Sequence, residues 1–254
     1  NIRPARTWDG VPHKVGQFDL VVVRENTEGF YADRNIASGS SEMLITPDVV
    51  VSLRRITRDC CARIARSAFE LAMTRGRHVS VVHKANVLKI GDGMFIEECQ
   101  RVAREFPEVR VDEFIVDAMM AHVVRAPQRF DVIVTTNMFG DILSDLTAEL
   151  SGSLGLGGSL NAGREHAMGQ AAHGSAPDIA GQNVANPFSL ILSAGQLLRW
   201  QGQRRQLPAF LDAAKAIELT AAAAVSAGEA TRDVGGRLGT AETGRAFAQR
   251  LLNA

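Results

Sequence analysis

The sequence predicts an α/β fold in which helices flank buried sheets. Short runs rich in valine and isoleucine alternate with longer stretches of helical periodicity, which is the pattern of strands covered by helices. The chain has 254 residues, of which 46% are hydrophobic, so it is long enough to bury a sizeable core. No run of about 18 apolar residues occurs, and the sequence therefore contains no candidate membrane span.

The predicted elements of the first half follow this alternation. A helix is expected to begin with Thr46 as its N-cap and Pro47 at its first helical position, with apolar residues recurring over 49–71. Two more helices are expected, one over 93–106 and one after Phe139. The predicted strands are the runs 20–23, 79–82, 114–116 and 132–135.

A glycine-rich stretch over 151–163 interrupts this alternation, and we interpret it as a loop at a domain junction. The sequence thus divides into residues 1–151 and 152–254. The second part is mostly helical, with a helix that begins at the Asn-Pro pair 186–187 and another over 207–227. These helices need an apolar surface to cover. Either the first part or a sheet upstream of this chain would provide it, and we favour the upstream sheet.

The charge balance favours a small-molecule partner. Lysine plus arginine and aspartate plus glutamate number 28 each, so the sequence indicates neither a nucleic-acid-binding surface nor an acidic tail. Cys60, Cys61 and Cys99 lie in helical patterns without metal-ligand spacing. They are typical of buried apolar thiols in a reducing compartment such as the cytoplasm.

A charged residue follows each predicted strand. Arg24, Lys84 and Asp117 follow the first three runs, and the segment TTNMFGDILSD includes the end of the fourth. Because ligands bind beyond the carboxyl ends of strands in open α/β sheets, these residues are expected to share one site. Polar residues are common at strand ends, so the argument depends on all four positions together.

Asp141 and Asp145 are four residues apart and therefore share one face of the helix expected after Phe139. Like charges at this spacing repel each other, and a bound hard cation would turn the repulsion into coordination. The alternative is a pair of solvated acids near a helix N-terminus, where negative charge is favourable. With Asp117 the set contains three carboxylates and neither thiol nor imidazole, which favours Mg²⁺ or Mn²⁺ over zinc.

Lys84 and Tyr31 are the candidate proton carriers. A buried lysine beside a metal loses its proton more readily than a solvated one, and a phenol beside a lysine can act as an acid. Tyr31 is the only tyrosine of the chain, and amphipathic packing is its alternative role. His83 is expected to point to the opposite face of its strand, so we interpret it as structural.

Six motifs are spread in order along essentially the whole chain: NIRPAR, VRENTEGFYADRN, HKANVLK, VDAMMAH, TTNMFGDILSD and HGSAPDIAGQNVANP. Together they resemble the isocitrate/isopropylmalate dehydrogenase family of metal-dependent, β-decarboxylating dehydrogenases. The resemblance implies the two-domain fold of that family, which is not a standard Rossmann domain. It also implies that the opening third of the family's fold is absent from this chain.

The resemblance assigns a role to each candidate residue. Arg3 and Arg24 would bind the carboxylates of the substrate through bidentate hydrogen bonds. Lys84 would accept the hydroxyl proton, directly or through water, and Tyr31 would protonate the enol left after carbon dioxide departs. The three aspartates would hold a cation that binds the substrate's hydroxyl and carboxylate oxygens and stabilises the enolate.

The resemblance also implies a homodimer with shared active sites. In the family, the lysine and the first metal aspartate come from the partner subunit, so Lys84 and Asp117 would complete a neighbour's site. The stretch 32–43, for which no regular element is expected, lies where family members extend an arm used in dimer contact. Residues 1–151 would form the small domain for substrate, metal and dimerisation, and 152–254 the C-terminal part of the large cofactor-binding domain.

The cofactor is expected on HGSAPDIAG, where small residues let backbone amides approach phosphate and adenosine. Asp178 stands where NAD-specific members present an acid to the ribose hydroxyls, so the resemblance implies NAD rather than NADP. An ordinary turn residue is the alternative. Asn186 resembles a residue that contacts adenine. The expected cofactor-binding residues are His173, Gly174, Ser175, Ala176, Asp178 and Asn186.

Two departures from the family limit what the resemblance implies. Gln170, Ala171 and Ala172 stand where the family often has Glu-Pro-Val, which removes an acid near the nicotinamide. The segment that meets the variable group of the substrate lies in the opening third, so isopropylmalate, isocitrate, homoisocitrate and tartrate or malate all stay open. RENTEG resembles the isocitrate, homoisocitrate and tartrate branches more than the isopropylmalate branch.

Two other functions compete with this one. A non-catalytic regulatory subunit of the same fold would bind ligands without turnover, but such subunits tend to lose catalytic positions that this chain retains. A metal-dependent decarboxylase without redox chemistry would not need the adenosine-binding segment.

Overall fold

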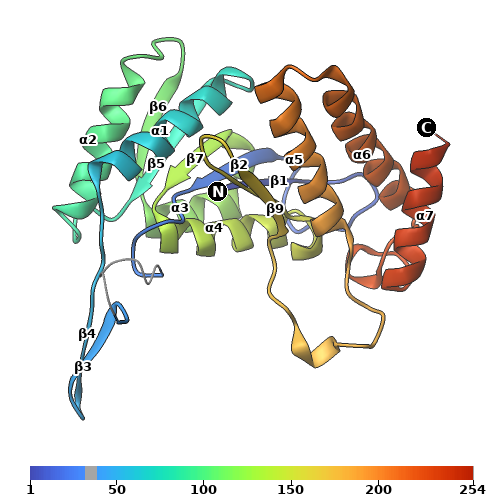
Figure 1. Ribbon diagram of the computed structural model, residues 1–254, viewed down its shortest axis with the longest axis horizontal. Helices are drawn as coiled ribbons and strands as arrows, with labels where there is room; N and C mark the ends of the chain where they lie inside the picture. The colour runs from blue at the N-terminus through green and yellow to red at the C-terminus, as the bar shows by residue number, and fades with distance from the viewer. Residues whose placement is uncertain (32–38, 254) are drawn as a thin grey trace. The chain divides into compact units, whose positions relative to one another are not determined.

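The computed structural model describes residues 1–31 and 39–253, and the chain forms two compact units (Figure 1). The first unit comprises Asn1–Asp19 and Asp145–Ala254, and the second comprises Leu20–Ser144. Both units contain strands and helices, which confirms the predicted α/β class. No helix in the described part of the chain combines the length and the hydrophobicity needed to cross a bilayer.

The strands and helices are named in chain order. The strands are β1 (Ile2–Arg6), β2 (Asp19–Arg24), β3 (Glu42–Thr46), β4 (Val49–Ser52), β5 (His78–His83), β6 (Arg110–Ile115), β7 (Val132–Thr135), β8 (Gly158–Ala162) and β9 (Ala167–Ala171). The α-helices are α1 (Arg58–Met73), α2 (Gly91–Ala103), α3 (Val116–Arg125), α4 (Asn137–Leu150), α5 (Phe188–Arg205), α6 (Pro208–Ser226) and α7 (Thr240–Leu252). Short 3-10 turns are η2 (Pro127–Arg129), η3 (Leu154–Leu156), η4 (Pro177–Ile179) and η5 (Arg232–Val234).

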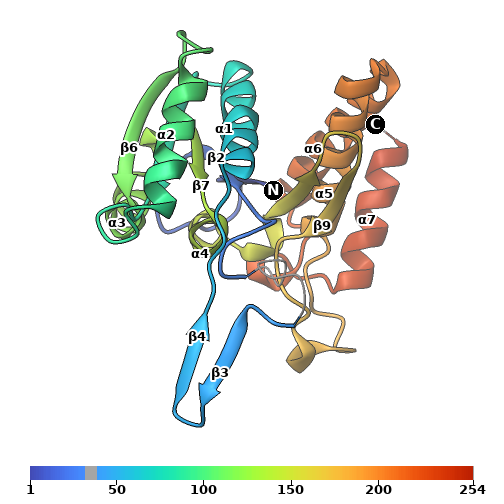
Figure 2. The same cartoon turned by 60° about the vertical axis from the view of Figure 1, so that its left-hand side comes forward.

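The second unit is built on four parallel strands in the order β6-β5-β7-β2. β2, β5 and β7 are the predicted valine-rich runs, and nearly all of their residues are buried, as expected for strands covered on both faces. The connections from β2 through α1 to β5 and from β5 through α2 to β6 run in one direction across the sheet, and the connection from β6 through α3 to β7 runs in the opposite direction. Right-handed connections therefore place α1 and α2 on one face and α3 on the other. Figures 1 and 2 show α1 and α2 side by side.

The predicted helix over 46–71 is wrong in its first part. Thr46 and Val49 are cross-strand partners in the antiparallel β3–β4 hairpin, and Pro47 and Asp48 form the two-residue turn between them. Proline is favoured at the first central position of a β-turn as well as at the start of a helix, so its signal was ambiguous. The β-branched run that follows it favours a strand.

Helix α1 begins only at Arg58, and Thr57 is its N-cap. The Thr57 hydroxyl accepts a hydrogen bond from the Cys60 amide at 3.3 Å. Glu28 accepts the Thr57 amide at 2.8 Å and the Thr57 hydroxyl at 3.0 Å, so a buried carboxylate completes the cap. Of the predicted arm over 32–43, residues 32–38 lie outside the described residues, and the end of the stretch belongs to β3.

The first unit contains β1, β8 and β9, joined in that order by antiparallel pairing. The glycine-rich stretch predicted as a loop thus contains β8, and α5 packs on β8 and β9. Gly158 and Gly169 permit this contact, since a Cβ on Gly169 would lie 2.7 Å from the Ser193 carbonyl oxygen of α5. The hydroxyl of Ser193 accepts the Ser159 amide at 2.9 Å. Strands of this chain therefore provide a surface that α5 covers.

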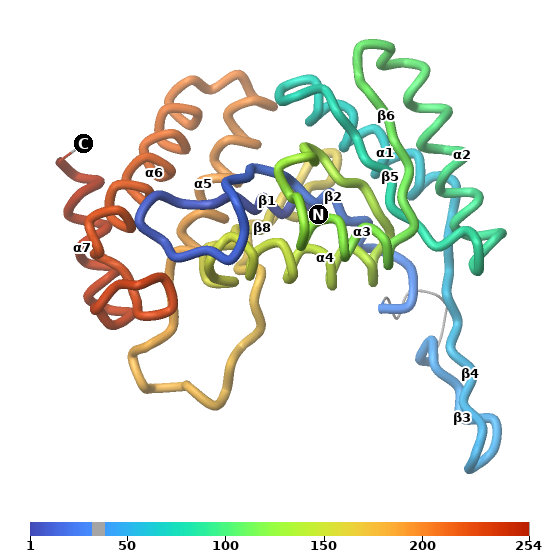
Figure 3. Tube along the Cα trace, turned by 180° about the vertical axis from the view of Figure 1, so that it is seen from behind, coloured from blue at the N-terminus to red at the C-terminus, as the bar shows by residue number. Residues whose placement is uncertain are grey.

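The boundary between the units differs from the predicted division at 151/152. Ile2 of β1 pairs with Leu160 of β8, so the first residues of the chain belong with its C-terminal part. Figure 3 shows the loop after β1 beside α6 and α7, and the Ser226 hydroxyl donates to the Asp9 carbonyl at 3.0 Å. Trp8 of this loop lies in the core of the first unit.

Candidate active site

The carboxyl ends of β2, β5, β6 and β7 lie at one edge of the parallel strands, and the candidate residues of the second unit follow them. Arg24 is the last residue of β2, and Lys84 directly follows β5. Asp117 lies in the first turn of α3, which continues directly from β6. The strand-end pattern of the sequence is therefore present in the structure.

Arg24 is held by α4, which begins two residues after β7. Its Nε and Nη2 donate to Asn137 Oδ1 at 3.0 and 2.6 Å, and its Nη1 donates to the Asp141 carboxylate. Asn137 Nδ2 in turn donates to the Glu28 carbonyl at 2.7 Å. The guanidinium is nearly buried, so these acceptors both compensate its charge and fix its orientation.

Lys84 pairs with Asp117. Lys84 Nζ donates to Asp117 Oδ1 at 2.6 Å, and the Asp117 side chain is 69% exposed. The hydrogen bond from Lys84 is the main cause that lowers the pKa of Asp117 below its ordinary value. Asp117 is thus held in its anionic form, which is the form that binds a cation.

Arg3 and Asp145 meet in the first unit. Arg3 Nη1 donates to Asp145 Oδ1 at 3.4 Å, and Arg3 Nε donates to Asn1 Oδ1 at 2.8 Å. Asn1 Nδ2 donates to the hydroxyl of Ser159 on β8 at 2.9 Å. The predicted substrate arginine is therefore fixed to the strands of the first unit.

The three candidate metal ligands do not gather in one chain. Asp141 and Asp145 lie one turn apart on α4, as expected, whereas Asp117 lies on α3. Among residues 1–31 and 39–253, no group of three histidine, cysteine, aspartate or glutamate side chains is arranged to hold a metal ion. The oxygen-only donor set fits Mg²⁺ or Mn²⁺ in chemistry, and of the three candidate ligands two, Asp141 and Asp145, share α4.

Tyr31 is the last residue that the structure describes before the gap after β2, and it is 52% exposed. Glu25 shapes the loop that follows β2, because its carboxylate accepts the amides of Thr27 at 2.9 Å and of Glu28 at 3.0 Å. The Phe30 ring beside Tyr31 lies 5.7 Å from the Arg54 guanidinium. An exposed phenol on a shaped loop does not fit the alternative role of amphipathic core packing.

The predicted cofactor segment is an exposed loop that begins after β9. Ala176 has a left-handed backbone (φ 43°), which is unusual for a residue with a side chain, and η4 begins immediately after it. Gly174 has open space where a Cβ would lie. His173 contacts its neighbour through Nδ1 and the Gly174 carbonyl at 2.9 Å, and the Asp178 side chain is exposed in the first turn of η4.

Asn186 has a structural role in addition to its expected one. Its Oδ1 accepts the Phe188 amide at 2.9 Å at the start of α5, and its Nδ2 donates to Asp233 at 2.9 Å. Residues 170–172, which depart from the Glu-Pro-Val of the family, lie at the end of β9 and directly after it. The Ala172 amide donates to the Ser189 hydroxyl of α5 at 3.1 Å.

Several residues around the candidate site were not singled out from the sequence. Asn137 and Gly140 hold and accommodate Arg24, and Asp92 accepts the backbone amide of Lys84 at 2.6 Å. The motif TTNMFGDILSD contains the first two, but only their contacts show what they do. Asp92 follows the motif HKANVLK and carried no signal beyond being an acid near the start of a helix.

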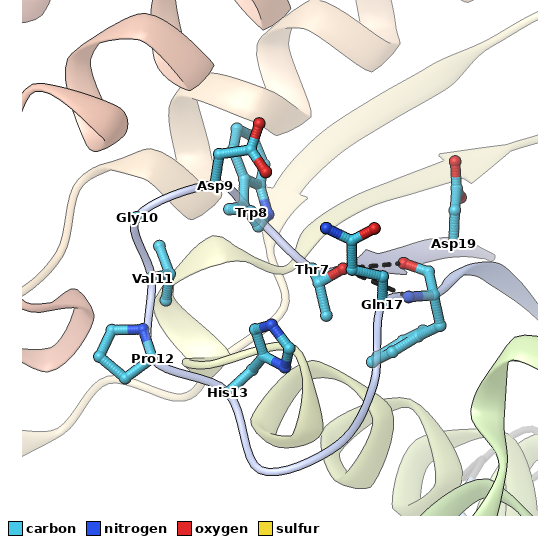
Figure 4. Close-up of a pocket in the computed structure, with 10 residues that line it drawn as sticks. Thr7, Trp8, Asp9, Gly10, Val11, Pro12, His13, Gln17 and Asp19 are labelled. Atoms are coloured by element: carbon cyan, nitrogen blue, oxygen red, sulfur yellow. Dashed lines mark hydrogen bonds between the residues drawn. The ribbon is translucent and has the colours of Figure 1, made fainter.

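A pocket of about 660 Å³ lies elsewhere in the first unit, in the loop after β1 (Figure 4). Its wall includes the exposed side chains of Asp9, His13 and Gln17. None of the predicted site residues lines it.

Comparison with known proteins identifies the family. The model of the isocitrate/isopropylmalate dehydrogenase family matches residues 1–247. The 3-isopropylmalate dehydrogenase of Archaeoglobus fulgidus is 42% identical over 99% of this chain and 73% of its own length. The isocitrate/homoisocitrate dehydrogenase of Thermus thermophilus is 41% identical over 100% of this chain and 70% of its own length.

A solved structure agrees with these relatives. The isocitrate dehydrogenase of Methylococcus capsulatus superposes with a TM-score of 0.89 at 40% identity, over 98% of this chain and 72% of that one. The matches cover nearly all of this chain and under three quarters of each relative. The predicted fold is thereby confirmed, and the chain belongs to the isocitrate/isopropylmalate dehydrogenase family.

Proposed function

We propose that this protein is an NAD-dependent enzyme that oxidises and decarboxylates a small 2-hydroxy di- or tricarboxylic acid with Mg²⁺ or Mn²⁺. One observation carries the proposal: each candidate metal aspartate forms an ion pair with a basic residue that is itself a candidate for substrate binding or proton transfer. An anionic substrate and its metal would replace these internal partners one for one, so that no charged group loses its compensation. The pairs are Asp141 with Arg24, Asp145 with Arg3 and Asp117 with Lys84.

The side chains divide the reaction between them. Arg3 and Arg24 orient the substrate's carboxylates, since a guanidinium matches a carboxylate with two parallel hydrogen bonds. Lys84, in its neutral form, takes the hydroxyl proton at Nζ, and Tyr31 delivers a proton from its hydroxyl to the carbon that has lost carbon dioxide. The metal supplies a Lewis acid that stabilises negative charge on the substrate oxygens.

We place Lys84 and Asp117 in the active site of a partner subunit in a homodimer. The exposure of Asp117 and its distance in sequence from the pair on α4 support this arrangement. The β3–β4 hairpin supports it as well, because its apolar residues are exposed: Leu44 by 70%, Ile45 by 57% and Val50 by 57%. Apolar surface of this kind marks an interaction site.

Complementation between two inactive variants tests the shared site. In a dimer of Tyr31→Phe with Lys84→Met, one site has the intact tyrosine of one subunit and the intact lysine of the other. Random mixing of the denatured and refolded full-length variants is expected to restore about a quarter of the wild-type activity, because about half of the dimers are mixed and each has one intact site. Activity no higher than that of the separate variants would overturn the shared site.

We assign NAD as the cofactor on the basis of Asp178, whose carboxylate would accept ribose hydroxyls and repel the 2′-phosphate of NADP. We place the reaction in the cytoplasm. The three cysteines are free, and two of them are buried, with burial raising the pKa of Cys61 to about 12, which suits a reducing compartment.

The reaction itself is tested by NADH formation in the full-length protein. The substrates to compare are isopropylmalate, homoisocitrate, isocitrate, malate and tartrate, each with and without Mn²⁺. We expect one of them to give a metal-dependent signal with NAD and a weaker one with NADP. Binding of substrate and NAD without turnover would instead favour a regulatory subunit, and carbon dioxide release without NADH would favour a simple decarboxylase.

A further inference from the structure

Asp92 is a fully buried carboxylate in the first turn of α2. Its Oδ2 accepts the backbone amide of Lys84 at 2.6 Å, and its Oδ1 accepts Arg54 Nη2 at 2.6 Å. A buried carboxylate without such donors would strongly destabilise the fold. Burial therefore makes the two contacts obligatory and ties the Lys84 backbone to α2.

The backbone around Lys84 is fixed on its other side as well. The Lys84 carbonyl accepts the amides of Val87 at 3.0 Å and Leu88 at 2.8 Å. The amide of Ala85 donates to His83 Nδ1 at 3.1 Å. With Asp92 on its amide, Lys84 has a fully hydrogen-bonded backbone, and only its side-chain torsions remain free to place Nζ.

Arg54 connects this anchor to the rest of the second unit. Its side chain is 12% exposed, and besides Asp92 it contacts the Thr136 hydroxyl at 3.4 Å and the Phe30 ring at 5.7 Å. Thr136 precedes the residue that holds Arg24, and Phe30 precedes Tyr31. The Arg54–Asp92 pair thus connects the Lys84 backbone to the sequence neighbours of Asn137 and Tyr31.

We infer that Asp92, with Arg54 as its counter-ion, is the positioning residue of Lys84 and sets where this lysine enters the partner's active site. The inference rests on the proposed roles of Lys84 and Tyr31. Asp92 does not touch the substrate; it acts on the rate by fixing the strand end from which the proton acceptor projects. A small displacement of a proton acceptor lowers the rate of proton transfer much more than it weakens substrate binding.

Asp92→Asn tests this role. An amide side chain has one acceptor oxygen and one NH2 donor. In the variant the NH2 group therefore faces the N–H of either Lys84 or Arg54, and neither of these two donors has an acceptor there. We expect kcat of the full-length enzyme to fall about 10- to 100-fold, as for other supporting residues, while the KM values for substrate and NAD change by no more than about twofold. The matched control is Asp131→Asn, which removes the carboxylate of another largely buried pair, Arg75–Asp131 at 2.7 Å, and is expected to leave kcat unchanged.

Complementation shows on which residue Asp92 acts. If it positions Lys84, Asp92→Asn belongs to the same class as Lys84→Met. Mixed dimers with Tyr31→Phe then regain activity, and mixed dimers with Lys84→Met do not. The opposite pattern would place Asp92 in the site of its own chain, and recovery with neither variant would mean a general structural defect; either outcome overturns the inference.

A second variant keeps the test decisive if Asp92→Asn fails to fold. Asp92→Glu preserves the charge and displaces the carboxylate, so a smaller loss of kcat with the same complementation class is expected, and unchanged kcat would overturn the inference. Failure of Tyr31→Phe to complement Lys84→Met would overturn the shared-site proposal itself. That result is independent of any Asp92 variant, so the two failures are distinguishable.

Discussion

Arg24 lies so close to the first turn of α4 that only glycine fits at position 140. A Cβ on Gly140 would lie 2.6 Å from Arg24 Cγ and 3.2 Å from Thr135 Cγ2. This contact brings the guanidinium to Asn137 and Asp141, which neutralises its charge before any ligand arrives. Asp141 therefore has two roles in the proposed mechanism, as the partner of Arg24 in the free protein and as a metal ligand in the complex.

The variant Asp141→Asn tests whether Asp141 is needed for metal-dependent activity and not for the stability of the fold. Asn137 still holds Arg24 through Nε and Nη2, so the melting temperature is expected to change little. Activity at limiting Mn²⁺ is expected to fall by at least about 100-fold, because a carboxamide is a poorer ligand than a carboxylate. The measurement is kcat as a function of Mn²⁺ concentration, with Glu149→Gln, an exposed acid on the same helix, as the control. Near-normal turnover at low metal would exclude Asp141 as a ligand.

Asp178 is the residue that we expect to discriminate between NAD and NADP. Its side chain is exposed in η4, so a substitution changes the charge with little effect on packing. Asp178→Lys is expected to lower kcat/KM for NAD and raise it for NADP, each by about 10-fold or more. Asp178→Asn removes the charge alone and should give an intermediate ratio. An unchanged preference in both variants would show that another residue discriminates between the cofactors.

The residues of the candidate site were predictable where their chemistry depends on side-chain type at a strand end. Arg24 ends the valine-rich strand β2 and Lys84 follows the valine-rich strand β5, and these two strands are clear signals in the sequence. Asp117 comes two residues after the end of β6. Asp92 and Gly140 were not predictable in this way. Their roles follow from a backbone amide and from a close approach, which no spacing in the sequence encodes.

At the scale of elements, prediction succeeded for buried strands and failed for exposed or small-residue ones. β2, β5 and β7 are almost continuous apolar runs, whereas β8 and β9 consist largely of glycine, alanine, serine and asparagine. Their composition suits the close approach of α5, whose Ser193 hydroxyl hydrogen-bonds to the backbones of both strands. The same small residues removed the hydrophobic alternation by which a strand is recognised.

Helices α1 and α2 are joined through Glu98, whose side chain is largely buried. Arg101 donates a hydrogen bond to Glu98 at 2.8 Å, and Arg58 of α1 donates one at 3.2 Å. These hydrogen bonds, of which the one from Arg101 has the larger effect, hold the pKa of Glu98 below its ordinary value. A lowered carboxyl pKa contributes stability that is fully present above the unfolded-state pKa and is lost as the pH falls through the folded-state pKa.

Glu98→Gln is therefore expected to lower the free energy of unfolding near neutral pH by about 1 kcal/mol. The difference from wild type should narrow progressively as the pH falls below about 5, where the unfolded carboxyl begins to take up its proton. Urea unfolding over this pH range measures both quantities. Glu97→Gln is the control, because Glu97 also contacts Arg58, at 3.0 Å, but its side chain is 62% exposed. A pH-independent difference would mean that packing and not charge is responsible.

At the scale of the whole molecule, the proposed shared site requires two copies of the chain, and the candidate metal residues and the β3–β4 hairpin are the features that bear on it. Two of the candidate metal aspartates lie one turn apart on α4, and the third lies on α3. The hairpin presents apolar side chains that a lone chain leaves in water. An interface between two copies would cover these residues and bring the third aspartate to the partner's site.

The hairpin can be changed without disrupting its own pairing, because Leu44 and Val50 are cross-strand partners. The double variant Leu44→Glu, Val50→Lys replaces an apolar pair by an opposite-charge pair, which stabilises an isolated hairpin by a similar amount. Sedimentation velocity is expected to show monomers in place of dimers, with circular dichroism unchanged. Activity is expected to be lost although no active-site residue is altered, because Lys84 and Asp117 no longer reach a partner.

Leu252→Lys, at another exposed apolar residue, should change neither the oligomeric state nor the activity. A fully active monomer would contradict the shared site, and an unchanged dimer would place the interface on a different surface.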